Sequence, residues 1–194
     1  MKVGVLALQG AFREHREVLD ALGVESIEVR VPEALGALDA LILPGGESTT
    51  MSQLLDSSGL RGPMSECLRD GLPVLGTCAG MILLARDVLD GRADQQSFAI
   101  VDVAVRRNAY GRQRDSFEAD LDIPSIAARA GDTFRGVFIR APRIEHAGPD
   151  VIVLAMHDGH PVLACHGGAW VASFHPELAG DLRVHEAFLR EVRA

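Results

Sequence analysis

A chain of 194 residues is long enough for one hydrophobic core and short for two, which predicts a single domain over residues 1–194. Hydrophobic residues make up 47% of the chain and charged residues 24%, a balance that excludes a disordered protein, a collagen-like fibre and a disulfide-rich miniprotein. The formal charge is -8, with no basic cluster and no apolar run of roughly 20 residues, which argues against a nucleic-acid partner and against a membrane span.

The first half of the chain alternates strand-like and helix-like segments. Four apolar runs that end at or just before a glycine or proline predict strands at residues 3–8, 26–31, 40–43 and 72–76. Three further segments predict helices at residues 12–22, 48–55 and 81–85, the first of them ended by Gly23. Such alternation is typical of a parallel sheet with helices on both faces.

The second half is richer in short strands. Strands are predicted at residues 100–105, 117–121, 133–139, 151–155, 162–165 and 170–174. Turn pairs such as Asp158-Gly159 and Gly167-Gly168 separate some of them and predict antiparallel hairpins, and a helix over residues 182–192 closes the chain. The expected fold is therefore a three-layer α/β fold, with a mostly parallel central sheet, helices on both faces and added antiparallel strands.

The chain has three cysteines, Cys67, Cys78 and Cys165. They are too few and too widely spaced for a disulfide framework, and their spacing matches no zinc site. A reducing cytoplasm is therefore the expected location, and it leaves thiols available for chemistry.

The motif Gly-Thr-Cys-Ala-Gly at residues 76–80 lies between an apolar strand and an apolar helix. A nucleophile elbow has this Gly-x-nucleophile-x-Gly form, because its sharp turn leaves little room on either side. Such a turn holds Cys78 at a helix N-terminus, where the dipole favours the reactive thiolate, and aims the Ala79 amide at a developing oxyanion. The alternative is a small buried cysteine in a tight turn.

The segment Ser-Phe-His-Pro-Glu at residues 173–177 follows the last predicted strand. His175 and Glu177 are two positions apart, so they project to the same side of an extended chain, and Pro176 favours that conformation for His175. A carboxylate beside an imidazole fixes the tautomer of the ring and stabilises its protonated form, as in Cys-His-acid triads. The alternative is a turn with a solvated histidine and glutamate.

The loop Pro-Gly-Gly-Glu-Ser-Thr-Thr at residues 44–50 follows the third predicted strand. Its two glycines let the backbone approach a ligand closely. It lacks the Gly-Lys-Ser/Thr of a phosphate-binding loop, and Glu47 would repel a phosphate but suit an amino group. The alternative is a plain loop in which Ser48 is the N-cap of the next helix, and both interpretations can hold together.

All three motifs follow the carboxyl ends of predicted strands, the edge at which open parallel sheets bind ligands. Together they resemble the class I, triad-type glutamine amidotransferases. Six longer stretches, in the same order along essentially the whole chain, more narrowly resemble the glutaminase subunits of pyridoxal 5'-phosphate synthase. They are VGVLALQGAFREH (3–15), LILPGGESTTM (41–51), GTCAGMILLA (76–85), VRRNAYGRQRDSFEADL (105–121), FIRAP (138–142) and SFHPELAGDLRVHEAFL (173–189).

The resemblance implies hydrolysis of L-glutamine to L-glutamate and ammonia. It implies that the ammonia passes through a tunnel to a separate (βα)8-barrel synthase subunit, which makes pyridoxal 5'-phosphate. In this interpretation Cys78 is the nucleophile, His175 and Glu177 complete the triad, and the amides of Gly46 and Ala79 are the oxyanion donors.

The resemblance also implies which residues bind the substrate and the partner. Six positions match glutamine-contacting residues: Gly46, Glu47, Ser48, Arg107, Ile139 and Arg140. A carboxylate clamp by Arg107 or Arg140 and an ammonium contact with Glu47 suit a zwitterion. Gln9 and Gly10 lie in the region associated with partner docking and activation. Neither a metal nor a bound cofactor is expected.

Three other interpretations stay open. The same glutaminase chemistry can supply ammonia to a different synthase, such as one for histidine or an aromatic precursor, although the GAFREH, RNAYGRQ and FIRAP stretches favour the pyridoxal 5'-phosphate partner. A stand-alone cysteine hydrolase or a redox-sensing α/β protein shares the elbow. A regulatory domain with a decayed site is disfavoured by the intact set of Cys78, His175 and Glu177.

Overall fold

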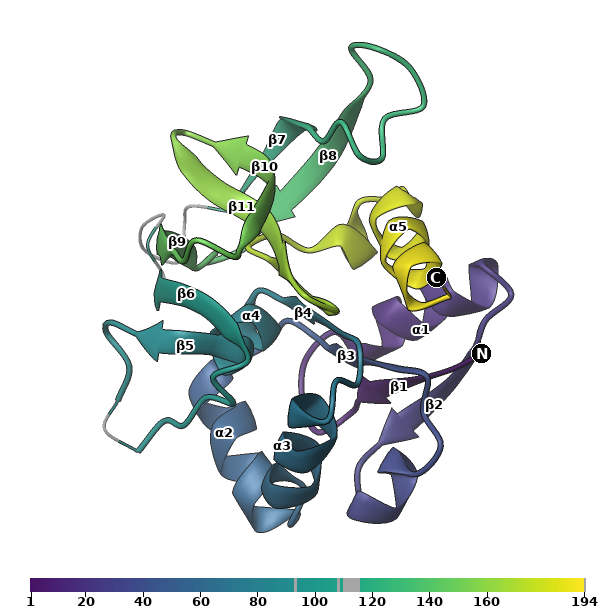
Figure 1. Ribbon diagram of the computed structural model, residues 1–194, viewed down its shortest axis with the longest axis vertical. Coiled ribbons are helices and arrows are strands. Elements are labelled where there is room, and N and C mark those ends of the chain that lie inside the picture. The colour runs from purple at the N-terminus through teal and green to yellow at the C-terminus, as the bar shows by residue number, and fades with distance from the viewer. Residues whose placement is uncertain (93, 108, 110–115, 194) are drawn as a thin grey trace.

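The structure, a computed structural model, describes residues 1–92, 94–107, 109 and 116–193. Five parallel strands form the centre of its main sheet, in the spatial order β2 (Glu25–Val29), β1 (Lys2–Leu6), β3 (Ala40–Leu43), β4 (Val74–Thr77) and β12 (Ala169–Ala172) (Figure 1). Two antiparallel strands, β11 (His160–His166) and β10 (Ile152–His157), continue the sheet beyond β12. This arrangement confirms the predicted mostly parallel sheet with added antiparallel strands.

Alternate side chains of the central strands enter two separate cores, so these strands are buried on both faces. In β3, for example, Leu41 and Leu43 enter one core and Ile42 enters the other. The first face is covered by α2 (Ser48–Ser57), α3 (Arg61–Arg69) and α4 (Ala79–Leu84), and the second by α1 (Phe12–Ala21) and α5 (Arg183–Val192) (Figure 1). The sheet and its two helical layers are the three predicted layers.

Two smaller sheets complete the cores. A three-stranded sheet of β5 (Ala85–Val88), β6 (Val101–Arg106) and β9 (Arg143–Ala147) adds Val103 and Ile144 to the first core. A hairpin of β7 (Phe117–Asp122) and β8 (Thr133–Phe138) adds Phe134 and Phe138 to the second. Two short 3-10 helices, η1 (Pro32–Leu35) and η2 (Pro176–Leu178), follow β2 and β12.

Some elements differ from the sequence prediction. The helix α3 was not predicted, because its Gly62 and Pro63 are typical of a turn. A proline in the first turn of a helix nevertheless removes no intrahelical hydrogen bond. β5 begins at Ala85, directly after α4, and no turn residue marks the change. β9 was not predicted either. The sequence predicts antiparallel pairing for the last strand, but β12 pairs in parallel with β4 as well as antiparallel with β11, and so belongs to the central sheet.

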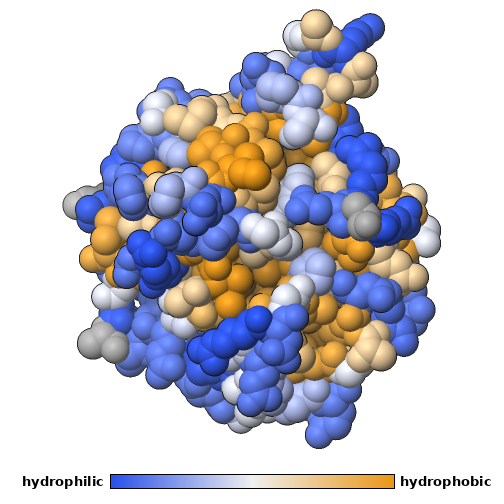
Figure 2. Space-filling model, in the orientation of Figure 1, coloured by the Kyte–Doolittle hydropathy of each residue, from blue (hydrophilic) through white to orange (hydrophobic). Residues whose placement is uncertain are grey.

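The outer strand β10 closes one edge of the main sheet. A two-residue turn joins it to β11, with Asp158 and Gly159 both at positive φ (48° and 77°), as the Asp-Gly pair predicts. β10 exposes Ile152, Val153 and Met156, and Figure 2 shows apolar surface over this hairpin. None of the helices in the described part of the chain combines the length and the apolar character needed to span a bilayer.

Candidate active site

The three sequence motifs meet at one edge of the central sheet. The 44–50 loop follows β3, Cys78 follows β4 and His175 follows β12, and these three strands are neighbours in the order β3, β4, β12. Because neighbouring parallel strands end at the same edge, the motifs lie side by side, as predicted. The backbone amide of His175 donates a 2.8 Å hydrogen bond to the Val137 carbonyl, which fixes the segment after β12 against β8.

The turn that carries Cys78 has the backbone of a nucleophile elbow. Cys78 has φ 49° and ψ -102°, a strained conformation for any residue with a side chain, which costs about 1–3 kcal/mol. Its amide donates to the Ala172 carbonyl at 2.8 Å. A Cβ on Gly80 would lie 2.0 Å from the Leu43 carbonyl oxygen, and one on Gly76 would lie 2.7 Å from the Gly80 backbone. Both glycines are therefore required by close backbone packing.

His175 connects the sulfur to a carboxylate. Its Nδ1 lies 2.7 Å from Oε1 of Glu177, and the ring lines the same cavity as Cys78. Burial lowers the pKa of His175, but the hydrogen bonds to Cys78 and Glu177 outweigh it and raise the pKa to about 10. Burial raises the pKa of Glu177, but His15 and the bond from His175 outweigh it and lower the pKa to about 2. The raised pKa of His175 and the lowered pKa of Glu177 both favour a protonated imidazole beside an ionised carboxylate at neutral pH.

The loop after β3 packs directly on this pair. A Cβ on Gly45 would lie only 2.3 Å from Cε1 of His175, so a glycine is needed for the ring to occupy its place. Across the site, the Cys78 sulfur lies 3.8 Å from the Ile139 carbonyl oxygen, and Arg140 follows with φ 45°. Two residues with positive φ, Cys78 and Arg140, thus line the same cavity.

A cavity of about 380 Å³ opens beside the sulfur, a volume suited to a small ligand. It is lined by Gly10, Ala11, Glu14, Gly45, Gly46, Glu47, Ser48, Cys78, Ile82, Arg107, Ile139, Arg140, His175 and Leu178. All six residues predicted to contact glutamine are among them. Ala79 and Glu177 are buried and contribute no lining surface, and Gln9 reaches the site through a hydrogen bond to Glu47.

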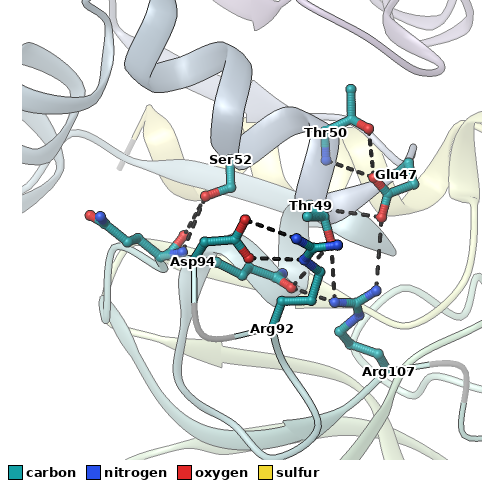
Figure 3. A network of polar contacts seen from close by, with 9 residues as sticks. Glu47, Thr49, Thr50, Ser52, Arg92, Asp94 and Arg107 are labelled. Carbon is teal, nitrogen blue, oxygen red and sulfur yellow. Dashed lines mark hydrogen bonds and ion pairs between the residues drawn. The ribbon is translucent and has the colours of Figure 1, made fainter.

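The rim of the cavity carries a polar network (Figure 3). The guanidinium of Arg107 lies 3.1 Å from Thr49 Oγ1, 2.5 Å from Gln95 Oε1 and 3.8 Å from a Glu47 carboxylate oxygen. The Glu47 carboxylate also accepts from the amides of Thr49 (3.1 Å) and Thr50 (2.6 Å). Glu47, and not the predicted Ser48, is therefore the N-cap of α2. Hydrogen bonds from neighbouring residues therefore orient the side chains of both Arg107 and Glu47.

Comparison with known proteins agrees with this arrangement. Residues 5–194 match the SNO glutamine amidotransferase family. The chain belongs to this family. It is 54% identical to Pyridoxal 5'-phosphate synthase subunit PdxT of Mycobacteroides abscessus, over 99% of this chain and 97% of that protein. A protein of the same name from Pelotomaculum thermopropionicum is also 54% identical, over 100% of this chain and 97% of its own.

A solved structure of a glutamine amidotransferase shares the fold closely. It superposes with a TM-score of 0.91 at 45% identity and covers 99% of both chains. These comparisons confirm the predicted enzyme class, a glutamine amidotransferase, and the resemblance to glutaminase subunits of pyridoxal 5'-phosphate synthase.

The loop after β1 packs against the loop after β3. Gln9 Oε1 accepts a 2.8 Å hydrogen bond from the Glu47 amide, and the Ala11 amide donates to the Gly45 carbonyl at 3.0 Å. Gly10 has φ 93°, and a Cβ there would lie 1.9 Å from the Gly45 carbonyl oxygen. The predicted docking residues therefore touch the predicted glutamine-binding loop.

Several residues around the site lie outside the predicted set. Glu14 and Leu178 line the cavity, and His15 and His185 are fully buried behind Glu177. His15 precedes the buried Val18 and Leu19 by three and four positions, so helical spacing places it on the inward face of α1. That spacing was the available signal. In the 105–121 stretch, residues 108 and 110–115 lie outside the described residues.

Proposed function

We propose that the chain hydrolyses L-glutamine through Cys78, His175 and Glu177 and delivers the ammonia to a (βα)8-barrel synthase subunit that makes pyridoxal 5'-phosphate. One observation carries the catalytic part of the proposal. His175, whose Nδ1 lies 2.7 Å from Glu177, and Cys78, in a strained backbone conformation, line one cavity of about 380 Å³. The names of the 54% identical relatives support the pyridoxal 5'-phosphate part.

In the first half-reaction the Cys78 thiolate attacks the side-chain amide carbon of glutamine. The carbonyl oxygen becomes an oxyanion, which the amides of Gly46 and Ala79 stabilise. The Ala79 amide belongs to the first turn of α4, where backbone donors have no partner within the helix. His175 then gives its proton to the departing nitrogen, the C–N bond breaks, and ammonia and a thioester on Cys78 remain.

In the second half-reaction water attacks the thioester carbon. His175, now neutral, accepts a proton from this water, and the collapse of the intermediate releases glutamate and the thiolate. Glu177 holds Nδ1 of His175 throughout, so the other ring nitrogen stays directed to the reacting atoms. One glutamine and one water thus give one glutamate and one ammonia.

The charges on the cavity wall suit the zwitterionic end of the substrate. Arg107 and Arg140 provide guanidinium groups for the α-carboxylate, and Glu47 provides a carboxylate for the α-ammonium. The backbone of Gly46 and Ile139 and the side chain of Ser48 complete the proposed glutamine-binding set. Charge complementarity of this kind selects an amino acid over a neutral amide.

Gln9 and Gly10 are the proposed partner-docking and activation residues. They lie against Gly45, Gly46 and Glu47, so a partner that moves the loop after β1 also moves the proposed oxyanion donor at Gly46. This coupling gives a physical route by which the synthase subunit stimulates glutamine hydrolysis.

The proposal also includes a single domain over residues 1–194 and a cytoplasmic location. Both cores form on the two faces of one sheet, which supports a single unit. Cys67, Cys78 and Cys165 are all free thiols, a state that a reducing compartment maintains, which supports the location.

The deciding measurement is ammonia release from L-glutamine by the purified chain, alone and with the barrel-type synthase subunit. We expect turnover that rises when the synthase is added and that is absent in both conditions for Cys78→Ala. A turnover rate that does not change when the synthase is added would instead indicate a stand-alone cysteine hydrolase. Stimulation only by another acceptor enzyme would overturn the pyridoxal 5'-phosphate partner.

A further inference from the structure

A buried polar cluster lies behind the proposed triad. It consists of His15 on α1, Thr77 at the end of β4 and His185 on α5, and none of the three has any exposed surface. Nδ1 of His15 lies 2.9 Å from Nε2 of His185, and Nε2 of His15 lies 3.1 Å from the Thr77 hydroxyl. The helices α1 and α5, neighbours on one face of the sheet in Figure 1, therefore meet through two histidine rings.

One oxygen of Glu177 depends on this cluster. Oε1 accepts the hydrogen bond from His175, whereas the buried Oε2 has no hydrogen bond from any described residue. Nε2 of His15 lies 3.4 Å from Oε2. A buried carboxylate is costly unless neighbouring dipoles or charges compensate it, so an N–H at His15 Nε2 is the compensation that the geometry offers.

The contacts favour one arrangement of protons. With hydrogen on Nε2, His15 directs an N–H toward Thr77 and Glu177, and its Nδ1 accepts from Nε2–H of His185. The opposite tautomers would turn a lone pair of His15 toward the carboxylate. They would also bury an unpaired N–H at Nδ1 of His185, an atom with no hydrogen-bond partner among the described residues.

Both rings are neutral in this arrangement. Burial lowers the pKa of His15, against the opposing charge of Glu177. Burial, with His15, lowers the pKa of His185 to about 3. The titratable groups that face His15 are Glu177, His175, His185 and Glu14. At neutral pH His15 therefore offers the carboxylate an N–H dipole without a net charge, and Glu177 keeps its negative charge for His175.

We propose that His15 is a positioning residue of the glutaminase site. Its Nε2–H holds the carboxylate of Glu177 in the orientation that His175 requires, and its contact with Thr77 ties that carboxylate to the strand that carries Cys78. His185 fixes the ring of His15 by donating to Nδ1. The proposal rests on the triad proposed above and extends it to a residue outside the set that lines the cavity.

The test compares two substitutions that place different groups near Glu177. His15→Phe keeps a ring and removes the donor, whereas His15→Gln puts an amide N–H near the position of Nε2. We expect His15→Phe to lower kcat by about tenfold or more, because the buried carboxylate loses the N–H that compensates and orients it, with KM changed by less than about twofold. His15→Gln should recover kcat to within about threefold of the wild type.

A stability control separates positioning from packing. Met64→Ala removes a buried side chain on the opposite face of the sheet and destabilises the fold without contact to the triad. It should lower the melting temperature and leave kcat within about twofold. The proposal is overturned if His15→Phe keeps wild-type kcat, or if His15→Gln and His15→Phe lose kcat equally.

The tautomer of His15 can be read in the unmodified protein, so the proposal remains testable if His15→Phe does not fold. Long-range ¹⁵N spectra of the histidine rings should show neutral His15 protonated at Nε2, and protonation at Nδ1 alone contradicts the proposal. The Cys78→Ala variant keeps the two proposals distinct. If it retains turnover, the triad itself is wrong; if it is inactive while His15→Phe is normal, only the positioning role fails.

Discussion

The interior of the active site and its rim use similar charged groups in different surroundings. In the interior, His175 and Glu177 are 6% and 7% exposed, and the fully buried His15 lies behind them. At the rim, the side chains of Arg107 and Glu47 are 17% and 41% exposed (Figure 3). Water screens the rim pairs and weakens them, whereas the interior pairs have little solvent to replace a lost partner.

The two carboxylates illustrate the consequence. Burial raises the pKa of Glu177, but His15 and His175 lower it to about 2. Burial also raises the pKa of Glu47, but hydrogen bonds from Thr50 and Thr49 together outweigh it and lower the pKa below its ordinary value. Substitutions in the interior should therefore affect the chemical step, and substitutions at the rim should affect substrate binding and local stability.

The largest effect is expected at Cys78. Cys78→Ala should lower glutamine turnover by more than about 10³-fold, because nothing else in the elbow can replace the nucleophile. The protein should still fold, since alanine fits the space of the thiol. Cys78→Gly is a matched variant. It lacks the thiol, and glycine adopts the positive φ without strain, so its free energy of unfolding should be about 1 kcal/mol higher than that of Cys78→Ala. Turnover near the wild-type rate in either variant would remove Cys78 from the mechanism.

A smaller loss is expected when Glu177 is made neutral. Glu177→Gln should retain partial activity and lose about 10²–10³-fold in kcat, because an amide still contacts His175 but no longer stabilises its protonated form. KM should change little. A rate of ammonia release equal to that of the wild type would exclude an orienting role for Glu177.

The same substitution should change the pH dependence of stability. The pKa of His175 is raised from 6.5 to about 10, so its contribution is complete below pH 6.5 and is lost as the pH rises toward 10. The pKa of Glu177 is lowered from 4.5 to about 2, so its contribution is complete above pH 4.5 and is lost as the pH falls toward 2. The difference in melting temperature between the wild type and Glu177→Gln should be greatest between pH 4.5 and pH 6.5, where both contributions are complete. A difference independent of pH would contradict the ion pair.

At the rim, substitution of Arg107 should mainly weaken glutamine binding. Arg107→Gln removes the guanidinium from the cavity wall and should raise KM by about tenfold, with kcat within about threefold. Gln95→Ala removes only a neighbour that orients Arg107 and should give a smaller increase in the same direction. A larger effect on kcat than on KM would move Arg107 from binding to catalysis.

What the sequence predicts well is local. The elbow, the His175–Glu177 pair and the loop after β3 are each contiguous and each follows an apolar run, so their residues and their common edge follow from short-range patterns. The cap of α2 did not follow, because Glu47 and Ser48 are adjacent and only the folded loop decides which side chain faces the free amides.

What the sequence predicts poorly depends on pairing between distant segments. His15 and His185 are 170 positions apart, and the spacing on α1 indicates that His15 is buried but not what it contacts. The place of β12 in the parallel sheet depends likewise on its two neighbours, β4 and β11, and not on its own composition. Both features depend on tertiary contacts, which the conformational preferences of a short segment do not determine.

The smallest effect is expected at the N-cap of α2. Glu47→Ala removes the oxygens that accept from the amides of Thr49 and Thr50, which should lower the free energy of unfolding by about 1 kcal/mol. It also removes the proposed ammonium contact, so KM for glutamine should rise a few-fold. Glu47→Asp keeps the charge and can still accept from the first turn, so it should restore most of the stability and less of the KM. If Glu47→Ala lowered kcat as strongly as Glu177→Gln does, the assignment of substrate binding to the rim and of the chemical step to the interior would be wrong.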